Sequence, residues 1–311
     1  MQMAKLLIAY DATEGQTRKA GKDTDMSKNH EYTDWTAVGQ FVVGSWPILI
    51  SRKKVATMAK RTSPTAITKV GLPSDQDAQA AQQRLRSLAD PAVAAGSARF
   101  FKTAPGQYGE GDIFIGIKSP TLRTVAKEFK ALPLAEVECL LHSDIHEDRT
   151  LALVILVGQF TKADDATRKR IYDIYLANTG HINNWDLVDI SAPQIVGGYL
   201  EERSRKLLDR LAKSASIWER RIAVVATHWF IRHGDFSATL RIAEELRGDK
   251  EDLIPKAVGW VLREVGKRDV AALEAFLGEH CRVMHRTMLR YAIERLPDEK
   301  RRAYLRGKPQ S

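Results

Sequence analysis

The chain has 311 residues, of which 44% are hydrophobic and 28% are charged, and its formal net charge is +9. This length allows one large domain or two small ones. No stretch approaches the roughly 18 apolar residues that a membrane-spanning helix requires. The apolar run near the N-terminus reaches Asp11 too soon for a signal peptide. We therefore expect a soluble cytoplasmic protein that does not associate with membranes.

The cysteines and the charge narrow the choice of partners. Cys139 and Cys281 give neither a disulfide framework nor metal-ligand spacing, so we expect two buried thiols in a reducing compartment. The excess of basic residues favours a polyanionic partner such as nucleic acid, although it also serves solubility alone. The charge by itself does not decide between these two interpretations.

The N-terminal segment predicts a strand, a loop and a helix. Residues 4–10 are apolar enough for a short buried strand, and residues 11–17 form a loop of hydroxyl groups and glycine before a helix from Arg18. Such a loop can cradle a phosphate, and it resembles the opening of flavodoxin-like proteins, which bind FMN there. Residues 21–75 show no second βα unit. We expect residues 1–75 to be poorly ordered, with a flavin site as the alternative.

Helical signals begin at Pro73. Residues 74–77 are a helix-start signal, and the stretch from Ala78 to Leu88 is rich in helix formers. We expect Pro91 and Gly96 to interrupt helix formation after that stretch.

The remainder of the chain predicts helices in succession. A loop with three glycines at residues 106–112 leads to residues 113–117, and Ser119-Pro120 then starts a helix. Apolar residues at three- and four-residue spacing mark the helices that follow. We expect them at residues 122–129, 134–141, 147–160, 166–176, 185–195, 202–211, 217–231, 236–246, 253–265, 270–277, 282–293 and 297–305.

Short links between helices of this length predict antiparallel pairs, and stacked pairs of about 35–45 residues make an α-solenoid of the HEAT or armadillo type. His146–Ala152 and Trp218–Ala223 look like variants of one repeat helix. A solenoid is curved, and its concave face suits an elongated partner. We predict an all-α, HEAT-like superhelix over residues 76–306, preceded by the separate segment 1–75.

Asn183–Asp189 is the stretch that points most clearly to chemistry. In a helix, Trp185 and Asp189 would project from one face, one turn apart. Trp218–Arg221 and Trp260–Arg263 repeat the pairing of an indole with a nearby charge. A carboxylate between indole faces suits a passing cation, because aromatic rings and carboxylates both attract positive charge. Core packing of the indoles, and a salt bridge from Asp189 to a neighbouring repeat, are the structural alternatives.

Other catalytic motifs are missing from the sequence. It contains no hydrolase elbow, P-loop or zinc-protease helix. The pairs His142/His146 and His228/His233 have no evident third ligand. We therefore expect no metal site and no cofactor.

Five segments, in the same order along the chain, resemble the DNA alkylation repair family of HEAT-like, AlkD-like DNA glycosylases. The resemblance covers about residues 76–306 and implies excision of N3- and N7-alkylated purines from duplex DNA. The segments are Tyr108–Asp112 with Phe114–Ile117, His146–Arg149, Asn184–Asp189, Trp218–Arg221 and Gly259–Glu264.

The resemblance also implies roles for single residues. Asp189 falls on the catalytic carboxylate, and Trp185 and Trp260 fall on two catalytic indoles. Arg221 and Arg263 fall on DNA contacts. The family's N-terminal aromatic contact falls on Phe100, Phe101 or Tyr108. We expect the DNA-binding set to be Arg149, Arg220, Arg221, Arg263 and Tyr108.

The chemistry of alkylated purines fits these roles. A cationic purine is already a good leaving group and needs little help from a general acid. Its departure builds oxocarbenium character on the sugar, which the Asp189 carboxylate would stabilise while it orients a water. Each indole would add about 0.5–2 kcal/mol of aromatic–cation stabilisation. Since no lysine nucleophile is evident in these segments, we expect a monofunctional glycosylase without a lyase step.

The sequence also allows other functions. A HEAT-like protein could hold unusual DNA without cutting it, or it could be a scaffold for other proteins with an apolar or acidic groove. A flavin-dependent activity of the N-terminal segment is a further alternative. For the leading hypothesis, the partner is duplex DNA with alkylated purines, and we expect a monomer associated with the nucleoid.

Overall fold

The computed structural model describes residues 77–307. The regular structure of this region is helical, and its β-structure is limited to an isolated bridge between Ile113 and Ile145. The predicted all-α solenoid class is thereby confirmed. The predicted strand and phosphate loop of residues 4–20 lie outside the described residues, and the predicted boundary at residue 75 stays a prediction.

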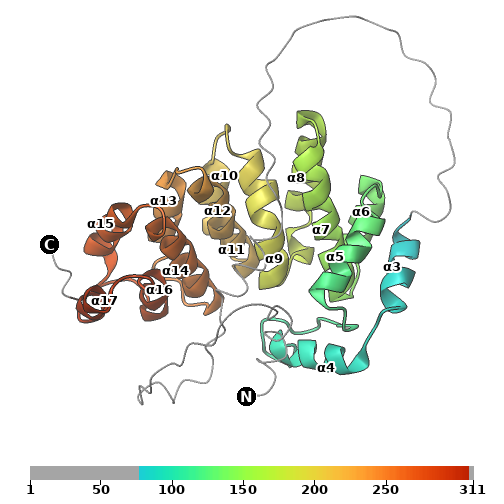
Figure 1. Cartoon of the computed structure of the whole chain (residues 1–311), viewed down its shortest axis with the longest axis horizontal. Coiled ribbons are helices and arrows are strands. Elements are labelled where there is room, and N and C mark those ends of the chain that lie inside the picture. The colour runs from blue at the N-terminus through green and yellow to red at the C-terminus, as the bar shows by residue number, and fades with distance from the viewer. Residues whose placement is uncertain (1–76, 308–311) are drawn as a thin grey trace, which may run out of the picture. The chain divides into compact units, whose positions relative to one another are not determined.

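Most connections between the described helices are short, and the longest of them, residues 101–118, joins α4 to α5 (Figure 1). Two other helical turns interrupt the α-helical series: a tighter 3-10 turn at Thr179–His181 and a wider π-helical turn at Pro193–Gly197. The α-helices are α3 (Ala78–Arg86), α4 (Pro91–Phe100), α5 (Ser119–Glu128), α6 (Leu134–Leu141), α7 (His146–Lys162), α8 (Asp165–Ala177), α9 (Trp185–Ala192), α10 (Lys206–Ala212), α11 (Ile217–Ala226), α12 (His228–Arg232), α13 (Ser237–Glu245), α14 (Leu253–Gly266), α15 (Val270–His280), α16 (Arg286–Ala292) and α17 (Asp298–Leu305).

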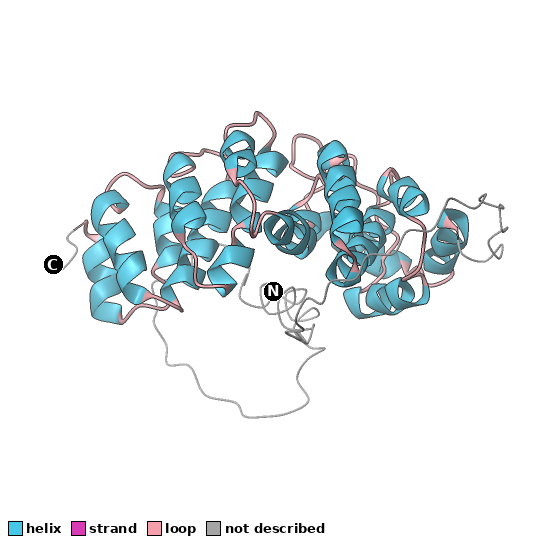
Figure 2. Ribbon diagram, turned by 90° about the horizontal axis from the view of Figure 1, so that it is seen from above, coloured by secondary structure: helices cyan, strands magenta, loops and turns pink. Residues whose placement is uncertain are grey.

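The helices are arranged in successive layers, each made of neighbouring helices, and one helix of each layer packs against the next layer. Helices α7, α9, α11, α14 and α16 pack in series, and α6, α8, α10, α13 and α15 each pack against a member of this series. Figure 2 shows the described helices standing side by side, and the labels in Figure 1 give their order. Because each layer contacts chiefly its neighbours, this is the architecture of a helical solenoid.

The starts of α7 and α11, which resemble each other in sequence, contain the same two hydrogen bonds. The Ser143 hydroxyl accepts a hydrogen bond from the Ile145 backbone N–H (3.1 Å), and the Ser143 carbonyl accepts one from Arg149 (2.8 Å). Ser214 repeats both contacts, at 3.0 Å with Ser216 and at 2.9 Å with Arg220. The starts of α7 and α11 therefore have the same local hydrogen-bond pattern, and the repeat relationship itself stays a prediction.

The expected interruption at Pro91 and Gly96 is wrong, because α4 contains both residues. The Asp90 side chain accepts hydrogen bonds from the N–H groups of Ala92 (2.9 Å) and Val93 (3.2 Å) and so caps the helix. Proline is tolerated in the first turn, where its missing N–H would have no helical partner. The sequence Asp-Pro is therefore a start signal here.

Some predicted boundaries also change. The helix expected over residues 217–231 is divided at Thr227, whose hydroxyl donates to the Val224 carbonyl at 2.6 Å. The helix expected over residues 185–195 leaves the α-helical pattern at Pro193, because proline lacks the N–H that an α-helix uses. The helices expected from residues 202 and 282 begin at Lys206 and Arg286.

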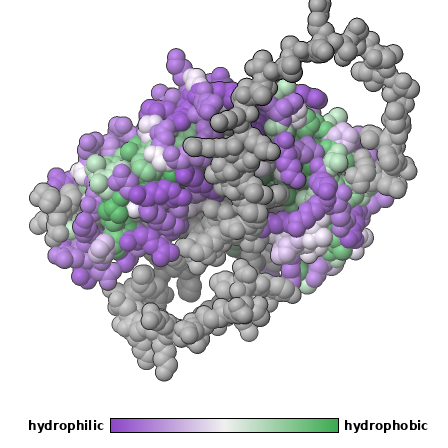
Figure 3. Space-filling view, turned by 45° about the horizontal axis from the view of Figure 1, so that its top comes forward, coloured by the Kyte–Doolittle hydropathy of each residue, from purple (hydrophilic) through white to green (hydrophobic). Residues whose placement is uncertain are grey.

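The apolar core follows the interior of the helical series, and one cysteine lies outside it. Cys281 is buried as expected, but Cys139 is exposed because α6 buries Val137, Leu140 and Leu141 on its other face. Hydrophilic residues predominate on the face in Figure 3, with smaller apolar areas between them. Within residues 77–307, no helix is both long and apolar enough to span a membrane.

Gly259 marks a close approach of α14 to α16. A Cβ at this position would lie 2.5 Å from the Tyr291 Cβ and 2.6 Å from the Met288 carbonyl oxygen. Gly278 in α15 is exposed, and a Cβ there would meet nothing within 4 Å. The two glycines therefore allow a matched comparison of the same substitution.

We predict that Gly259→Ala lowers the free energy of unfolding by about 1–3 kcal/mol, because the helices must separate to admit the methyl group. Gly278→Ala should raise it by about 0.5–1 kcal/mol, because alanine favours a helix over glycine. Urea denaturation measures both effects. A Gly259→Ala protein as stable as the Gly278→Ala protein would contradict the close packing of α14 on α16.

Candidate functional site

The start of α9 is fixed by a buried asparagine. The Asn184 Oδ1 accepts a hydrogen bond from the Trp185 backbone N–H (2.8 Å), and its Nδ2 donates to Asp112 (3.1 Å). Asp186 follows in the first turn, where the helix dipole favours a carboxylate. Asn184 therefore orients the helix on which Trp185 and Asp189 are one turn apart.

Asp189 forms a buried ion pair with Arg221 of α11. The Arg221 Nε donates to Oδ1 (2.9 Å) and its Nη2 donates to Oδ2 (2.7 Å), and each side chain is 1% exposed. The Arg221 Nη1 donates to the Leu253 carbonyl at 2.8 Å, so one guanidinium connects α9, α11 and α14. A bidentate pair of this kind fixes the plane of the carboxylate as well as its position.

Opposing effects act on the Asp189 carboxyl. Burial raises its pKa above the ordinary value, while the charge and hydrogen bonds of Arg221 act to lower it. Arginine stays protonated inside proteins, so a neutral Asp189 would leave a buried positive charge without compensation. The bidentate contact therefore keeps Asp189 ionised at neutral pH.

The Trp185 indole lies in a cluster of aromatic side chains. Its ring stacks on Phe101 with centroids 5.3 Å apart, and it meets the edge of Phe100 at 5.9 Å. The indole N–H donates to the Tyr108 hydroxyl at 3.2 Å. The three residues proposed from the sequence for the N-terminal aromatic contact therefore all meet the same indole, which is itself buried.

The second indole, Trp260, lies on α14 and is also buried. Its ring lies 5.3 Å from the His228 ring of α12, measured between centroids. Leu253 begins the same helix and accepts the hydrogen bond from Arg221. Asp189 and Trp260 thus lie on helices that Arg221 connects.

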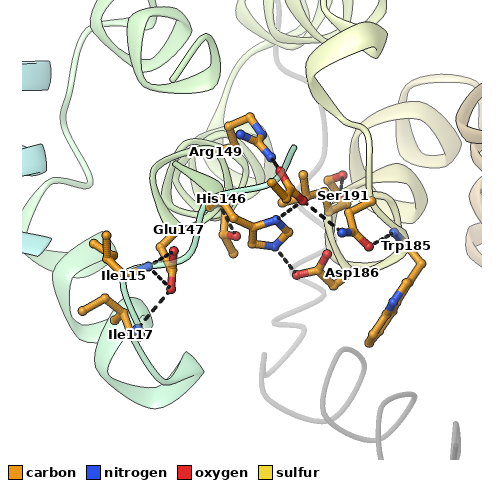
Figure 4. A network of polar contacts seen from close by, with 12 residues as sticks. Ile115, Ile117, His146, Glu147, Arg149, Trp185, Asp186 and Ser191 are labelled. Carbon is orange, nitrogen blue, oxygen red and sulfur yellow. Dashed lines mark hydrogen bonds and ion pairs between the residues drawn. The ribbon is translucent and has the colours of Figure 1, made fainter. Parts of the chain in front are cut away.

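A buried histidine joins α7 to α9 (Figure 4). The two ring nitrogens of His146 lie 3.0 Å from Asp112 and 2.8 Å from Asp186, and Arg149 donates to the other Asp112 oxygen. Burial lowers the pKa of His146, but the two carboxylates outweigh burial and raise it to about 9. His146 is therefore protonated at neutral pH and forms an ionic bridge to both carboxylates.

The next residue, Glu147, shapes the preceding loop. Its carboxylate accepts from the backbone N–H groups of Ile115 (3.0 Å), Gly116 (2.7 Å) and Ile117 (3.2 Å). Gly116 has a φ of +84°, and a Cβ there would lie 2.1 Å from the Asp90 carbonyl oxygen. Only glycine fits this position, so the glycine and the carboxylate together set the path of the loop beside His146.

The arginines predicted to contact DNA are engaged inside the protein. The side chains of Arg149, Arg221 and Arg263 are at most 4% exposed, and that of Arg220 is 15% exposed. Burial of this degree favours a role in holding neighbouring helices over a direct contact with phosphate. Their carboxylate partners are Asp112 for Arg149, Asp249 for Arg220, Asp189 for Arg221, and Glu294 and Glu264 for Arg263. Tyr108 is half-buried.

Four residues at the centre of this arrangement had no role predicted from the sequence: Asp112, His146, Glu147 and Asp186. All four lie within the segments that resemble the glycosylase family. Three of them occupy the first turn of α7 or α9, where a charged side chain can act on a neighbouring element. Their pairing across the chain carries no signal in a single sequence.

The histidine pairs seen in the sequence contact separate partners. Among residues 77–307, no group of three or more His, Cys, Asp or Glu is placed to hold a metal ion. His142 contacts Asn178, His146 contacts Asp112 and Asp186, His228 lies against Trp260, and His233 contacts the Trp229 carbonyl.

The His146 bridge predicts that stability depends on pH. Its folded-state pKa of about 9 lies above the ordinary 6.5, so its contribution is complete below about pH 6.5 and is lost as the pH rises through about 9. The free energy of unfolding of His146→Gln should lie below that of the parent at pH 6.5, and the gap should narrow toward pH 9–10. Denaturant titrations at several pH values measure this gap. The exposed His233→Gln serves as control, and a gap that stays constant for His146→Gln would rule out the ionic bridge.

Comparisons with known proteins point to a family and to a shared fold. A family model described as DNA alkylation repair enzyme matches residues 81–296, which includes all five segments found in the sequence. A solved structure of a predicted DNA alkylation repair enzyme from Enterococcus faecalis is 18% identical with a TM-score of 0.54, and the match covers 68% of this chain and 97% of that chain. At this identity the structural match supports the fold alone. No curated protein matches the sequence.

Proposed function

The chain belongs to the DNA alkylation repair enzyme family, and from this we propose that it is a DNA glycosylase acting on positively charged N3- and N7-alkylated purines in duplex DNA. The single observation that carries the proposal is the placement of Asp189. Its carboxylate lies one turn after Trp185 and is fixed by two hydrogen bonds from Arg221.

A fixed carboxylate suits a reaction that builds positive charge on a sugar. Groups that are oriented before the reaction stabilise the developing charge without reorganisation at the moment of bond breaking. Each carboxylate oxygen has two lone pairs, and Arg221 occupies one on each. The free lone pairs would face the anomeric carbon or orient the attacking water.

The aromatic cluster supplies the approach to this carboxylate. Asp189 is buried in the free protein, whereas Phe100 is 40% exposed and meets Trp185 at its edge. We propose that the DNA strand displaces Phe100 and reaches Asp189 along the Trp185 face. Because Asp189 is 1% exposed in the free protein, access of the sugar to its carboxylate depends on this displacement.

The leaving group explains why no general acid is assigned. An N3- or N7-alkylated purine departs as a neutral base from a cationic precursor, so its departure requires no proton. His146, the buried charged histidine nearest in sequence to this site, is already engaged by two carboxylates. We therefore propose hydrolysis driven by the carboxylate and the indoles.

A second candidate is a DNA-binding protein without catalysis. The burial of Asp189 and Trp260 favours it, because both side chains then serve the core, as the structural interpretation of the sequence allows. Binding of methylated duplex DNA without release of any base would select this function over the glycosylase.

We predict that Asp189→Asn slows base release from methylated duplex DNA by about 100- to 1,000-fold, as expected on removal of one electrostatic stabiliser. The substitution also leaves Arg221 without its partner, which costs about 3–5 kcal/mol of stability. The double variant Asp189→Asn/Arg221→Met should recover stability and remain inactive.

The matched control is Asp249→Asn, which removes the carboxylate partner of Arg220 in the adjoining layer. It should retain base release as long as it folds. A folded Asp189→Asn protein that releases bases at the parental rate would exclude Asp189 from the reaction.

We further predict that the product is an intact strand with an abasic site. Because the five segments contain no lysine, we expect no Schiff base, and the strand should break only after alkali treatment. Gel electrophoresis with and without alkali measures this directly. Strand breaks before alkali treatment, trapped by borohydride as a covalent complex, would show a lyase step.

A further inference from the structure

A basic cluster lies where α12 and α14 end. Arg232 is the last residue of α12, and Lys267 and Arg268 follow α14. Arg263 lies one turn earlier on α14, beside Glu264. None of Arg232, Lys267 and Arg268 takes part in the Asp189 and His146 networks.

Arg232 has no polar partner in the described chain. Its guanidinium is half-buried, its Nη2 is wholly buried, and it makes no hydrogen bond or ion pair there. Burial lowers the pKa of Arg232, and the nearby charge of Arg268 lowers it further, while Glu264 acts in the opposite direction. A half-buried charge without a partner is costly, which suggests that a ligand supplies the missing acceptors.

The carboxylates in the cluster are shared among several cations. Glu264 accepts from Lys267 at 2.5 Å, and it also lies 3.6 Å from Arg268 and 3.9 Å from Arg263. Glu294 pairs with Arg263. Three cationic side chains therefore share two carboxylates, and Arg232 contacts neither of them, so the cluster has a surplus of two positive charges. This surplus suits an anion.

His228 connects the cluster to the proposed reaction site. It lies one turn before Arg232 and is 2% exposed. Its ring lies at a tilt 5.3 Å from the Trp260 ring, and its Nδ1 has no hydrogen-bond partner. Burial, together with the charges of Arg232, Arg268 and Lys267, lowers its pKa to about 3. His228 is therefore neutral, and one of its nitrogens is available to donate to an anion.

A simpler explanation accounts for only part of the cluster. Cations near a helix C-terminus interact with the helix dipole and the last carbonyl groups. Arg268 does so, because it donates to the Glu264 carbonyl at 3.1 Å. Arg232 reaches no carbonyl, and the dipole gives no partner to the buried His228 Nδ1.

We propose that Arg232, Lys267 and Arg268, with His228 as a neutral donor, form a phosphate-binding site beside Trp260. The inference rests on the proposed function in one respect, namely that the ligand is DNA. The bound group is then one phosphodiester of the strand. Guanidinium donors match phosphate oxygens in geometry and charge. A phosphate held here fixes the register of the duplex against Trp260 and reads no sequence.

The test is binding of an unmodified duplex, which contains no base to release. The salt dependence of affinity counts the phosphates that the protein neutralises, with a slope of about 0.9 per contact. Arg232→Gln should reduce the slope by about 0.9 and weaken binding. The control Arg210→Gln removes the same charge from the last turn of α10, at an exposed position, and should leave the slope unchanged.

A second measurement distinguishes the source of the phosphate. If the site binds free phosphate, inorganic phosphate should raise the thermal midpoint of the parent but not that of Arg232→Gln. The salt slope for DNA binding should then be the same in Arg232→Gln as in the parent. That pair of results would overturn the assignment to DNA. If Arg232→Gln fails to fold, Lys267→Gln/Arg268→Gln takes its place, because both residues are exposed. If the folded variants keep both the parental salt slope and the parental rise in thermal midpoint with phosphate, the proposed site is wrong. If Arg232→Gln has a reduced salt slope while the parent releases no base from methylated duplex DNA, the glycosylase function is refuted and the phosphate site is retained.

Discussion

The structure depends on the ion pair between Asp189 and Arg221. Two buried charges are tolerated only when each satisfies the other, and here the contact is bidentate and a third hydrogen bond reaches Leu253. This requirement fixes the spacing of α9, α11 and α14. It also fixes the orientation of the carboxylate. The same interaction that holds three layers together therefore orients the group to which we assign the chemistry.

Similar pairs recur along the series of helices. His146 connects α7 to Asp112 and to Asp186 at the start of α9, and Arg263 of α14 reaches Glu294 after α16. Because each layer of a solenoid contacts chiefly its neighbours, such pairs fix the relation of one layer to the next. Such pairs would keep Trp185, Asp189 and Trp260 in fixed positions relative to one another when the chain binds a duplex.

The helices were predictable from the sequence, whereas the function of many charged residues was not. Apolar spacing located α7, α11 and α14, because it reports burial directly. Pro91 was misinterpreted, because its meaning depends on the Asp90 cap. The arginine predictions show the main limit: a sequence places Arg221 near the site, but it does not show that the side chain is buried and paired with Asp189. For Asp189, Trp185 and Trp260, the structural interpretation and the catalytic one both fit, since a buried pair can also orient a reactive group.

The most direct measurement is to incubate the protein with duplex DNA methylated at N7 of guanine and N3 of adenine, and to identify freed bases by mass spectrometry. The account predicts release of the methylated purines at a rate above that of spontaneous loss, with unmodified bases retained. Tight binding of the same duplex without any rise in free methylated base would contradict the central claim, and would leave Asp189 and Arg221 as a structural pair in a DNA-binding protein.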